Sequence, residues 1–103
     1  MALTHWASIY IAPGADPEKD SRTVSIAGMR NDFIAVDGLA DAADAAKNAV
    51  ADGAQLIELC GAFALLDDTS RDRIAAAIGN AVPVGYVSYS AVDAARVREV
   101  ASV

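Results

Sequence analysis

The sequence predicts a single α/β domain: a mainly parallel sheet of four or five strands with helices packed on it, in the manner of a small Rossmann-like or flavodoxin-like fold. The chain has 103 residues, of which 54% are hydrophobic, which suits one domain over residues 1–103 with its own core. From residue 32 onward, strand-like and helix-like segments alternate, a pattern typical of parallel strands joined by crossover helices. The alternative is a ferredoxin-like α+β arrangement, in which early strands pair antiparallel with the rest.

The first third of the chain predicts three strands and a loop. Residues 5–12, His-Trp-Ala-Ser-Ile-Tyr-Ile-Ala, are rich in aromatic and β-branched types and stop at Pro13-Gly14, which indicates a strand and its terminator. Residues 15–22 carry most of the local charge and predict a loop. Residues 23–27 predict a short second strand, and residues 32–36 predict a third.

The remainder predicts the alternating helices and strands. The alanine-rich run 39–52 has high helix propensity, and Gly53 suits its C-terminal end. After it we expect a strand over 55–61, a helix that begins near residues 67–70 and runs to about residue 78, a strand over 84–89 and a last helix over 92–100.

Charge and composition exclude several classes of function. The net charge of −6 argues against nucleic acid, because binding to phosphate backbones depends on basic residues. No apolar stretch is long enough to span a bilayer, so we expect no membrane partner. One cysteine and an N-terminus without signal-peptide features predict a cytoplasmic protein. A domain this small and apolar also predicts a homodimer.

Glu58 is the most informative single residue. It lies in the apolar run 55–61, Gln-Leu-Ile-Glu-Leu-Cys-Gly, two positions before the only cysteine, Cys60. Side chains two apart on a strand share a face, so Glu58 and Cys60 should point the same way. A carboxylate on a central strand must be paired or kept protonated. We therefore expect Glu58 to act as a general acid or base, with His5 as a possible structural partner across the sheet.

The predicted topology gathers further candidates at one edge of the sheet. Ligands of open α/β sheets bind beyond the carboxyl ends of the strands, and three predicted strand ends meet there. The residues that we expect to contact a substrate, besides Cys60 as a second acid or nucleophile, are His5, Tyr10, Asp37, Gly61, Phe63 and Tyr89. The alternative for each is an ordinary packing or hydrogen-bonding role.

Metal and cofactor sites are not predicted. His5 is the single histidine, and no His or Cys spacing typical of a zinc site is present. The turn that follows Cys60 lacks the glycine pattern and the lysine of a phosphate-binding loop. We therefore expect neither a metal nor a nucleotide cofactor.

Three motifs together resemble those of a known family. They are Ile-Tyr-Ile-Ala-Pro-Gly-Ala-Asp-Pro at 9–17, Leu-Ile-Glu-Leu-Cys-Gly at 56–61 and Val-Pro-Val-Gly-Tyr-Val at 82–87. With them the chain resembles, over almost its whole length, a family of small bacterial proteins grouped as domain of unknown function 6506. The resemblance implies a single α/β domain and no established reaction. Members often carry Gly-Gly-Phe-Gly after the cysteine, where this chain has Gly61-Ala62-Phe63-Ala64.

These observations lead to two functional hypotheses. The first is a metal-independent isomerase, lyase or hydrolase that uses Glu58 as general acid or base on a small organic molecule. Such reactions require positioned proton transfer in a dry pocket. The alternative is a non-catalytic module, either a small-molecule binder or a structural homo-oligomer.

Overall fold

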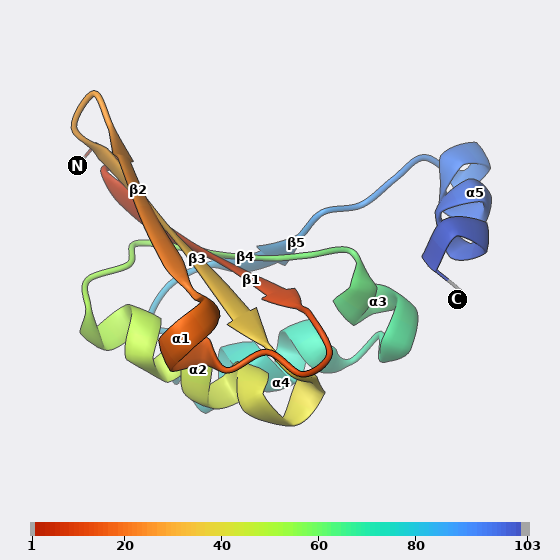
Figure 1. Cartoon of the computed structure of the whole chain (residues 1–103), viewed down its shortest axis with the longest axis horizontal. Coiled ribbons are helices and arrows are strands. Elements are labelled where there is room, and N and C mark those ends of the chain that lie inside the picture. The colour runs from red at the N-terminus through yellow and green to blue at the C-terminus, as the bar shows by residue number, and fades with distance from the viewer. Residues whose placement is uncertain (1, 102–103) are drawn as a thin grey trace.

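The computed structural model describes residues 2–101 (Figure 1). The elements in chain order are β1 (His5–Ile11), α1 (Pro17–Asp20), β2 (Arg22–Ile26), β3 (Met29–Val36), α2 (Leu39–Ala51), β4 (Ile57–Leu59), α3 (Ala62–Leu66), α4 (Ser70–Ala77), β5 (Val84–Tyr86) and α5 (Ala91–Ala101). They form a compact α/β domain, as the alternation of segments predicts.

The sheet has five strands in the order β2-β3-β1-β4-β5. Strand β1 is central and pairs in parallel with both β3 and β4, and β4 pairs in parallel with β5. Strand β2 lies at the edge and is antiparallel to β3. The expectation of a mainly parallel sheet is therefore confirmed, and the antiparallel pairing that we considered for the early strands is limited to this one pair.

One face of the sheet carries the hydrophobic core. On the two central strands, Ala7 and Ile9 of β1 lie beside Ile57 and Leu59 of β4, and all four are at most 1% exposed. Helix α2 presents a row of buried alanines to this face, and α4 adds Ile74. Small alanine side chains let a helix lie close to a sheet, so a core with few aromatic residues can still be dense.

Within residues 2–101, no helix lies across the other face of the sheet. Helices α1, α2 and α4 lie on the same side of the sheet in Figure 1, whereas α5 stands beyond β5, on the other side. Alternate residues of each strand therefore point away from the core: Trp6, Ser8 and Tyr10 of β1, together with their neighbours on β2, β3 and β4. We call this uncovered surface the open face.

Several elements differ from the predicted ones. Residues 17–20 form a helical turn instead of a loop, because Asp16 caps it by accepting a hydrogen bond from the Glu18 amide. Helix α3 was not predicted, since five residues are too few to show helical periodicity. Strands β4 and β5 have three residues each, although longer apolar runs surround them. Strand β4 pairs with β1 only along Ala7 to Ile9, so its paired length is three residues.

The tip of the β2–β3 hairpin contains a strained residue. Ile26 pairs with Met29, which leaves a two-residue loop. In this loop Ala27 has a φ of 53° and Gly28 has a φ of 80°. Two positive φ values are typical of a type I′ turn, which matches the twist of the flanking strands and favours Asn-Gly. Ala27 adopts this conformation at a cost of about 1 kcal/mol, because its Cβ crowds the following carbonyl group.

Replacement of this alanine should stabilise the protein. We expect Ala27→Asn to raise the free energy of unfolding by about 1 kcal/mol, because asparagine tolerates positive φ and completes the preferred pair with Gly28. Chemical denaturation of the two proteins measures the difference. The control is Ala81→Asn, at an exposed alanine whose φ is not positive; it should change stability by less than about 0.5 kcal/mol. Equal effects at both positions would contradict the turn assignment.

Candidate functional site

A row of residues crosses the open face at the middle of the sheet. In the strand register, Phe33 of β3 lies beside Ser8 of β1, Ser8 lies beside Glu58 of β4, and Glu58 lies beside Gly85 of β5. An added Cβ at Gly85 would meet nothing within 4 Å. The carboxylate of Glu58 therefore has a hydroxyl group on one side and open space on the other.

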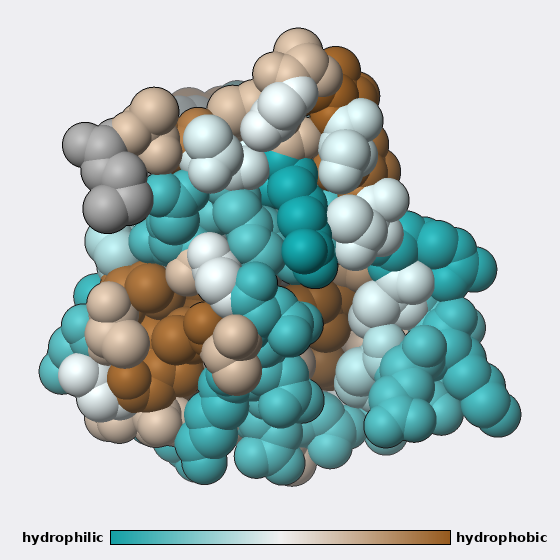
Figure 2. All heavy atoms as spheres, turned by 90° about the vertical axis from the view of Figure 1, so that its left-hand side faces the viewer, coloured by the Kyte–Doolittle hydropathy of each residue, from teal (hydrophilic) through white to brown (hydrophobic). Residues whose placement is uncertain are grey.

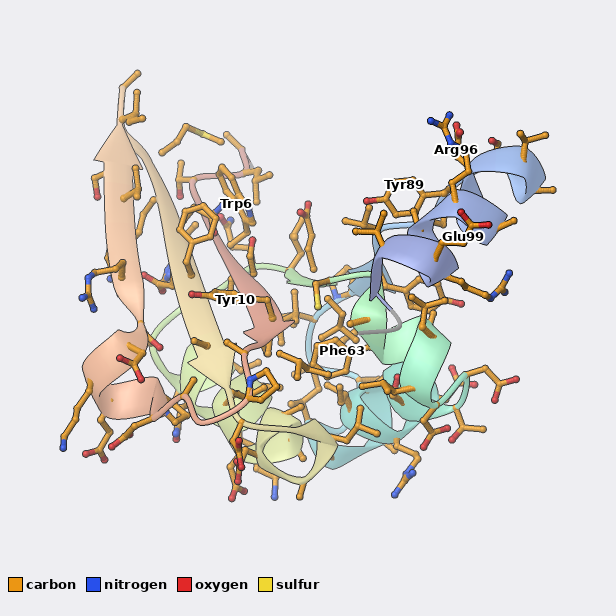
Figure 3. The ribbon with its side chains drawn as sticks, turned by 45° about the vertical axis from the view of Figure 1, so that its right-hand side comes forward. Trp6, Tyr10, Phe63, Tyr89, Arg96 and Glu99 are labelled. Atoms are coloured by element: carbon orange, nitrogen blue, oxygen red, sulfur yellow. The ribbon has the colours of Figure 1, made fainter. Side chains whose placement is uncertain are left out.

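Aromatic side chains surround this row. Trp6 and Tyr10 stand on either side of Ser8 along β1, and Figure 3 shows both on the part of the sheet between the hairpin and α5. The Ser8 hydroxyl donates a hydrogen bond to Asn31 Oδ1 at 3.2 Å, which fixes the polar centre of the face. The arrangement is a small polar patch between aromatic rings, a composition typical of ligand sites.

A shallow hollow lies next to this patch at the hairpin end of the open face. It has a volume of about 190 Å³ and is lined by Trp6, Val24, Ile26, Met29, Asn31 and Phe33. Apart from Asn31, its walls are apolar. The hollow could hold a flat apolar group near Trp6.

Glu58 lies on the open face and is exposed to solvent. The sequence suggested a desolvated carboxylate because β4 is an internal strand, but internal strands are buried on both faces only where helices cover both. Among the described residues, no hydrogen bond or ion pair reaches the Glu58 side chain. In the single chain, Glu58 is therefore an accessible acceptor and not a buried acid.

Cys60, Gly61 and Tyr89 come together at the carboxyl end of the sheet. Cys60 is half-buried and packs against the core, and its amide donates to the Ile9 carbonyl group at 3.0 Å. A Cβ at Gly61 would lie 3.4 Å from the Val87 carbonyl oxygen and 3.6 Å from Cε2 of Tyr89. The segment that follows β5 thus passes close over Gly61, and the structure gives this glycine a packing role.

Two of the predicted substrate-binding residues, Phe63 and Asp37, make contacts within the protein. Phe63 is fully buried in the core, because α3 is anchored to the sheet through this ring, so Phe63 does not reach a ligand surface. Asp37 Oδ1 accepts a hydrogen bond from the Gly14 amide at 2.5 Å. This bond ties the loop after β1 to the end of β3.

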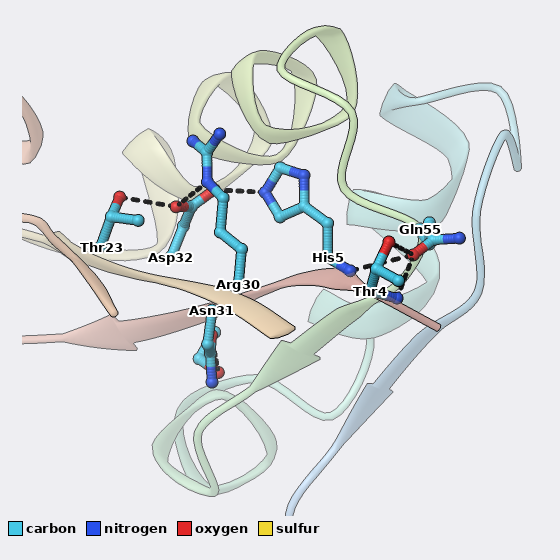
Figure 4. A network of polar contacts seen from close by, with 8 residues as sticks. Thr4, His5, Thr23, Arg30, Asn31, Asp32 and Gln55 are labelled. Atoms are coloured by element: carbon cyan, nitrogen blue, oxygen red, sulfur yellow. Dashed lines mark hydrogen bonds and ion pairs between the residues drawn. The ribbon is translucent and has the colours of Figure 1, made fainter. Parts of the chain in front are cut away.

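His5 pairs with Asp32 and not with Glu58 (Figure 4). The two residues of the expected pair lie on opposite faces of the sheet, because His5 shares the covered face with Ala7 while Glu58 lies beside Ser8. His5 Nε2 is 2.6 Å from Asp32 Oδ2. The other oxygen, Oδ1, accepts hydrogen bonds from the Thr23 hydroxyl at 2.7 Å and from Arg30 Nε at 2.9 Å.

The sequence predicted a buried carboxylate at Glu58, and the structure has one at Asp32 instead. Asp32 is 7% exposed, and burial by itself raises the pKa of its carboxyl group. The hydrogen bonds from His5, Thr23 and Arg30 outweigh burial and lower the pKa of Asp32 to about 2, from an ordinary value of 3.8. The charged form is thus stabilised in the folded protein, as is usual for a carboxylate with several donors. The network joins β1, β2 and β3.

The Asp32 network should make stability depend on acidic pH. The folded pKa lies below the unfolded value, so the network contributes fully above about pH 4 and its contribution is lost as pH falls towards 2. We expect Asp32→Asn to lower the free energy of unfolding at pH 7 by about 2 kcal/mol. Denaturation curves of both proteins between pH 2 and pH 7 measure the effect, and the difference should shrink at the acidic end.

The control for this prediction is Asp44→Asn on α2. Asp44 is exposed, and its ion pair with Lys47 is 4.0 Å long, so this variant should resemble the wild type at every pH. A gap between Asp32→Asn and the wild type that stays constant down to pH 2 would contradict the assigned role of the charge.

The acidic surface of the described chain does not form a metal site. A groove of about 490 Å³ between the loop after β1 and α2 is lined by Asp16, Glu18, Asp37, Asp41 and Asp44, but acidic side chains along a surface groove do not by themselves make a site. In residues 2–101, no group of three or more His, Cys, Asp or Glu side chains is placed to hold a metal ion.

No helix in the same range is long and apolar enough to cross a membrane.

Sequence reasoning missed Trp6, Ser8, Asn31 and Asp32 as site or network residues. A signal for the first two exists, because Trp6, Ser8 and Tyr10 alternate with the buried residues Ala7 and Ile9 in the first strand. Asp32 gave no such signal. It stands where the predicted third strand begins, and the structure extends that strand back to Met29.

Comparison with known proteins identifies a family but no activity. The chain matches the model of a family of unknown function, DUF6506, over residues 4–102, which confirms the resemblance seen in the motifs. No curated protein and no solved structure matches the chain. Function must therefore be inferred from the geometry of the open face.

Proposed function

The chain belongs to the DUF6506 family of unknown function, and from this premise we propose that it binds a small organic molecule on the open face, with the carboxylate of Glu58 as the polar anchor. The observation that carries the proposal is the position of this carboxylate. It has no partner among the described residues and stands between the Ser8 hydroxyl and the empty space over Gly85.

The chemistry of the face defines the class of ligand. A carboxylate accepts hydrogen bonds and favours a cationic or strongly donating group, such as an amine or an amidine. Trp6 and Tyr10 offer aromatic surface on the same side of the sheet, which suits a ring or an aliphatic chain next to that group. The net charge of −6 also raises the local concentration of cations.

The strand order supports a site on this part of the sheet. Without the antiparallel edge strand, the order β3-β1-β4-β5 corresponds to the beginning of a flavodoxin-like sheet, and we propose a small variant of that fold. In such sheets ligands bind near the carboxyl ends of the strands, where the strand order reverses. Here that point lies between β1 and β4, next to Tyr10 and Cys60.

We place the protein in the cytoplasm, where the single free thiol of Cys60 stays reduced.

Proton transfer is the second candidate function. Tyr10 and Glu58 lie on the same face of adjacent strands, so one bound molecule could contact both. Glu58 would then be the general acid or base in an isomerisation, elimination or hydrolysis, and Tyr10 would orient the substrate. Catalysis of this kind requires that water be excluded from the carboxylate, so it depends on what covers the open face.

A charge-neutral variant tests the anchor. Benzamidine combines an aromatic ring with a cationic donor group and serves as the probe. We expect Glu58→Gln to weaken its binding roughly tenfold to a hundredfold, because a charge-assisted hydrogen bond is worth about 1.5–3 kcal/mol. Isothermal titration calorimetry with the wild type and the variant measures the two dissociation constants.

The matched control removes the same charge at another exposed position. Glu18→Gln in α1 also lowers the net negative charge by one but lies on the helical side of the sheet. It should leave benzamidine affinity unchanged. Equal weakening by both variants would mean that benzamidine responds only to net charge. No binding by the wild type would contradict the proposed ligand class.

A further inference from the structure

The chain exposes more surface than is usual for a monomer of its mass. A folded monomer of 10.6 kDa is expected to expose about 5,500 Å², whereas this chain exposes 6385 Å². Its radius of gyration is 13.7 Å, compared with about 12.8 Å expected for this length. The excess of about 900 Å² is close to the area of about 800 Å² that each partner buries in a standard protein interface.

The open face itself is apolar and carries little charge. The exposed large apolar side chains of the face are Tyr10, Val24, Ile26 and Phe33, and Ile26 is 69% exposed. Glu58 is an isolated acidic side chain among them, and the guanidinium group of Arg22 is bonded to the carbonyl oxygens of Lys19 and Ser21. Figure 2 shows apolar residues at the top of the molecule, where the hairpin projects. Low charge at the centre of a patch is typical of protein interfaces.

The open face is framed by two projections at opposite edges. The β2–β3 hairpin rises at one edge and α5 stands beyond the other (Figures 1 and 3). Helix α5 contacts the domain loosely, across a hollow of about 170 Å³ that Ala94 and Val97 share with Leu65 and Tyr89. Its outer side chains Val92 and Val100 are 76% and 78% exposed. Both projections thus present uncovered apolar groups.

We propose that a second copy of this chain covers the open face, in a two-fold symmetric dimer in which α5 of each copy packs against the β2–β3 hairpin of the other. The two-fold axis of such a dimer lies between the two sheets and parallel to them. Depending on its direction, it places the hairpin opposite either the partner's hairpin or the partner's α5. The first arrangement brings projections tip to tip and holds the faces apart. The second lets each projection pass beside the other, so the two faces can close.

A dimer of this form completes the proposed site. Glu58, Ser8 and Tyr10 lie near the middle of the face, between the projections, so a partner sheet would exclude bulk water from them. The ligand would then be enclosed by both copies. The dimer itself rests on surface area, charge and shape, and it does not depend on whether the ligand proposed above is correct.

The first test measures mass. We expect sedimentation equilibrium and native mass spectrometry of the wild type at micromolar concentration to give a dimer. Ile26→Asp places a charge at the proposed contact and should raise the dimer dissociation constant roughly a hundredfold, as expected at a well-buried interface position. Ala76→Asp adds the same charge on an exposed position of α4 and should leave dimerisation unchanged. Circular dichroism and thermal melting verify that each variant is folded.

A second variant tests the role of α5 and keeps the proposal falsifiable where Ile26→Asp does not fold. Val100→Asp should also raise the dissociation constant roughly tenfold or more, because Val100 would lie against the partner's hairpin. A wild type that is monomeric at micromolar concentration overturns the proposal, whether because α5 folds over its own sheet or because another protein occupies the face. A dimer weakened by Ala76→Asp but not by Ile26→Asp or Val100→Asp overturns it equally.

Discussion

The covering of the sheet on one face only is the constraint on which the rest of the structure depends. The chain passes from β1 to β3 through a helical turn and the edge strand β2, and in the part of the chain that the structure describes no crossover helix lies over the second face. Helices α2 and α4 bury the residues around Ile9 and Leu59, so that face is a conventional core. The alternate residues of the same strands, among them Trp6 and Glu58, are left facing outward. An apolar face of this kind is costly to leave in water.

The two carboxylates on internal strands show how this constraint separates structure from function. Asp32 points to the covered face, where three side chains donate hydrogen bonds to it and lower its pKa. It holds the strands together, and its two oxygens already accept three hydrogen bonds from the protein. Glu58 points to the open face and has no partner among the described residues. A carboxylate that the protein does not satisfy is a better candidate for an external contact than one that it does.

The sequence predicted the long periodic segments well. It predicted poorly the features that depend on how strands pair. The alternation of segments correctly predicted α/β architecture and a mainly parallel sheet, and the alanine run 39–52 correctly predicted α2. The prediction that Glu58 is desolvated was wrong, because an apolar strand looks the same whether one or both faces are covered. The His5–Asp32 pair depends on register between β1 and β3, which no local pattern encodes. Phe63 could not be separated from a ligand contact without knowing that α3 docks on the core.

The most direct test of the account is the fluorescence of Trp6, the single tryptophan of the chain, followed as protein concentration is raised through the range in which the mass doubles. Trp6 lies half-buried on the open face. If the second copy covers this face, the Trp6 emission maximum should move to shorter wavelength as dimer forms, because the indole ring leaves water. An emission maximum that stays constant while the mass doubles would place the interface elsewhere and contradict the account.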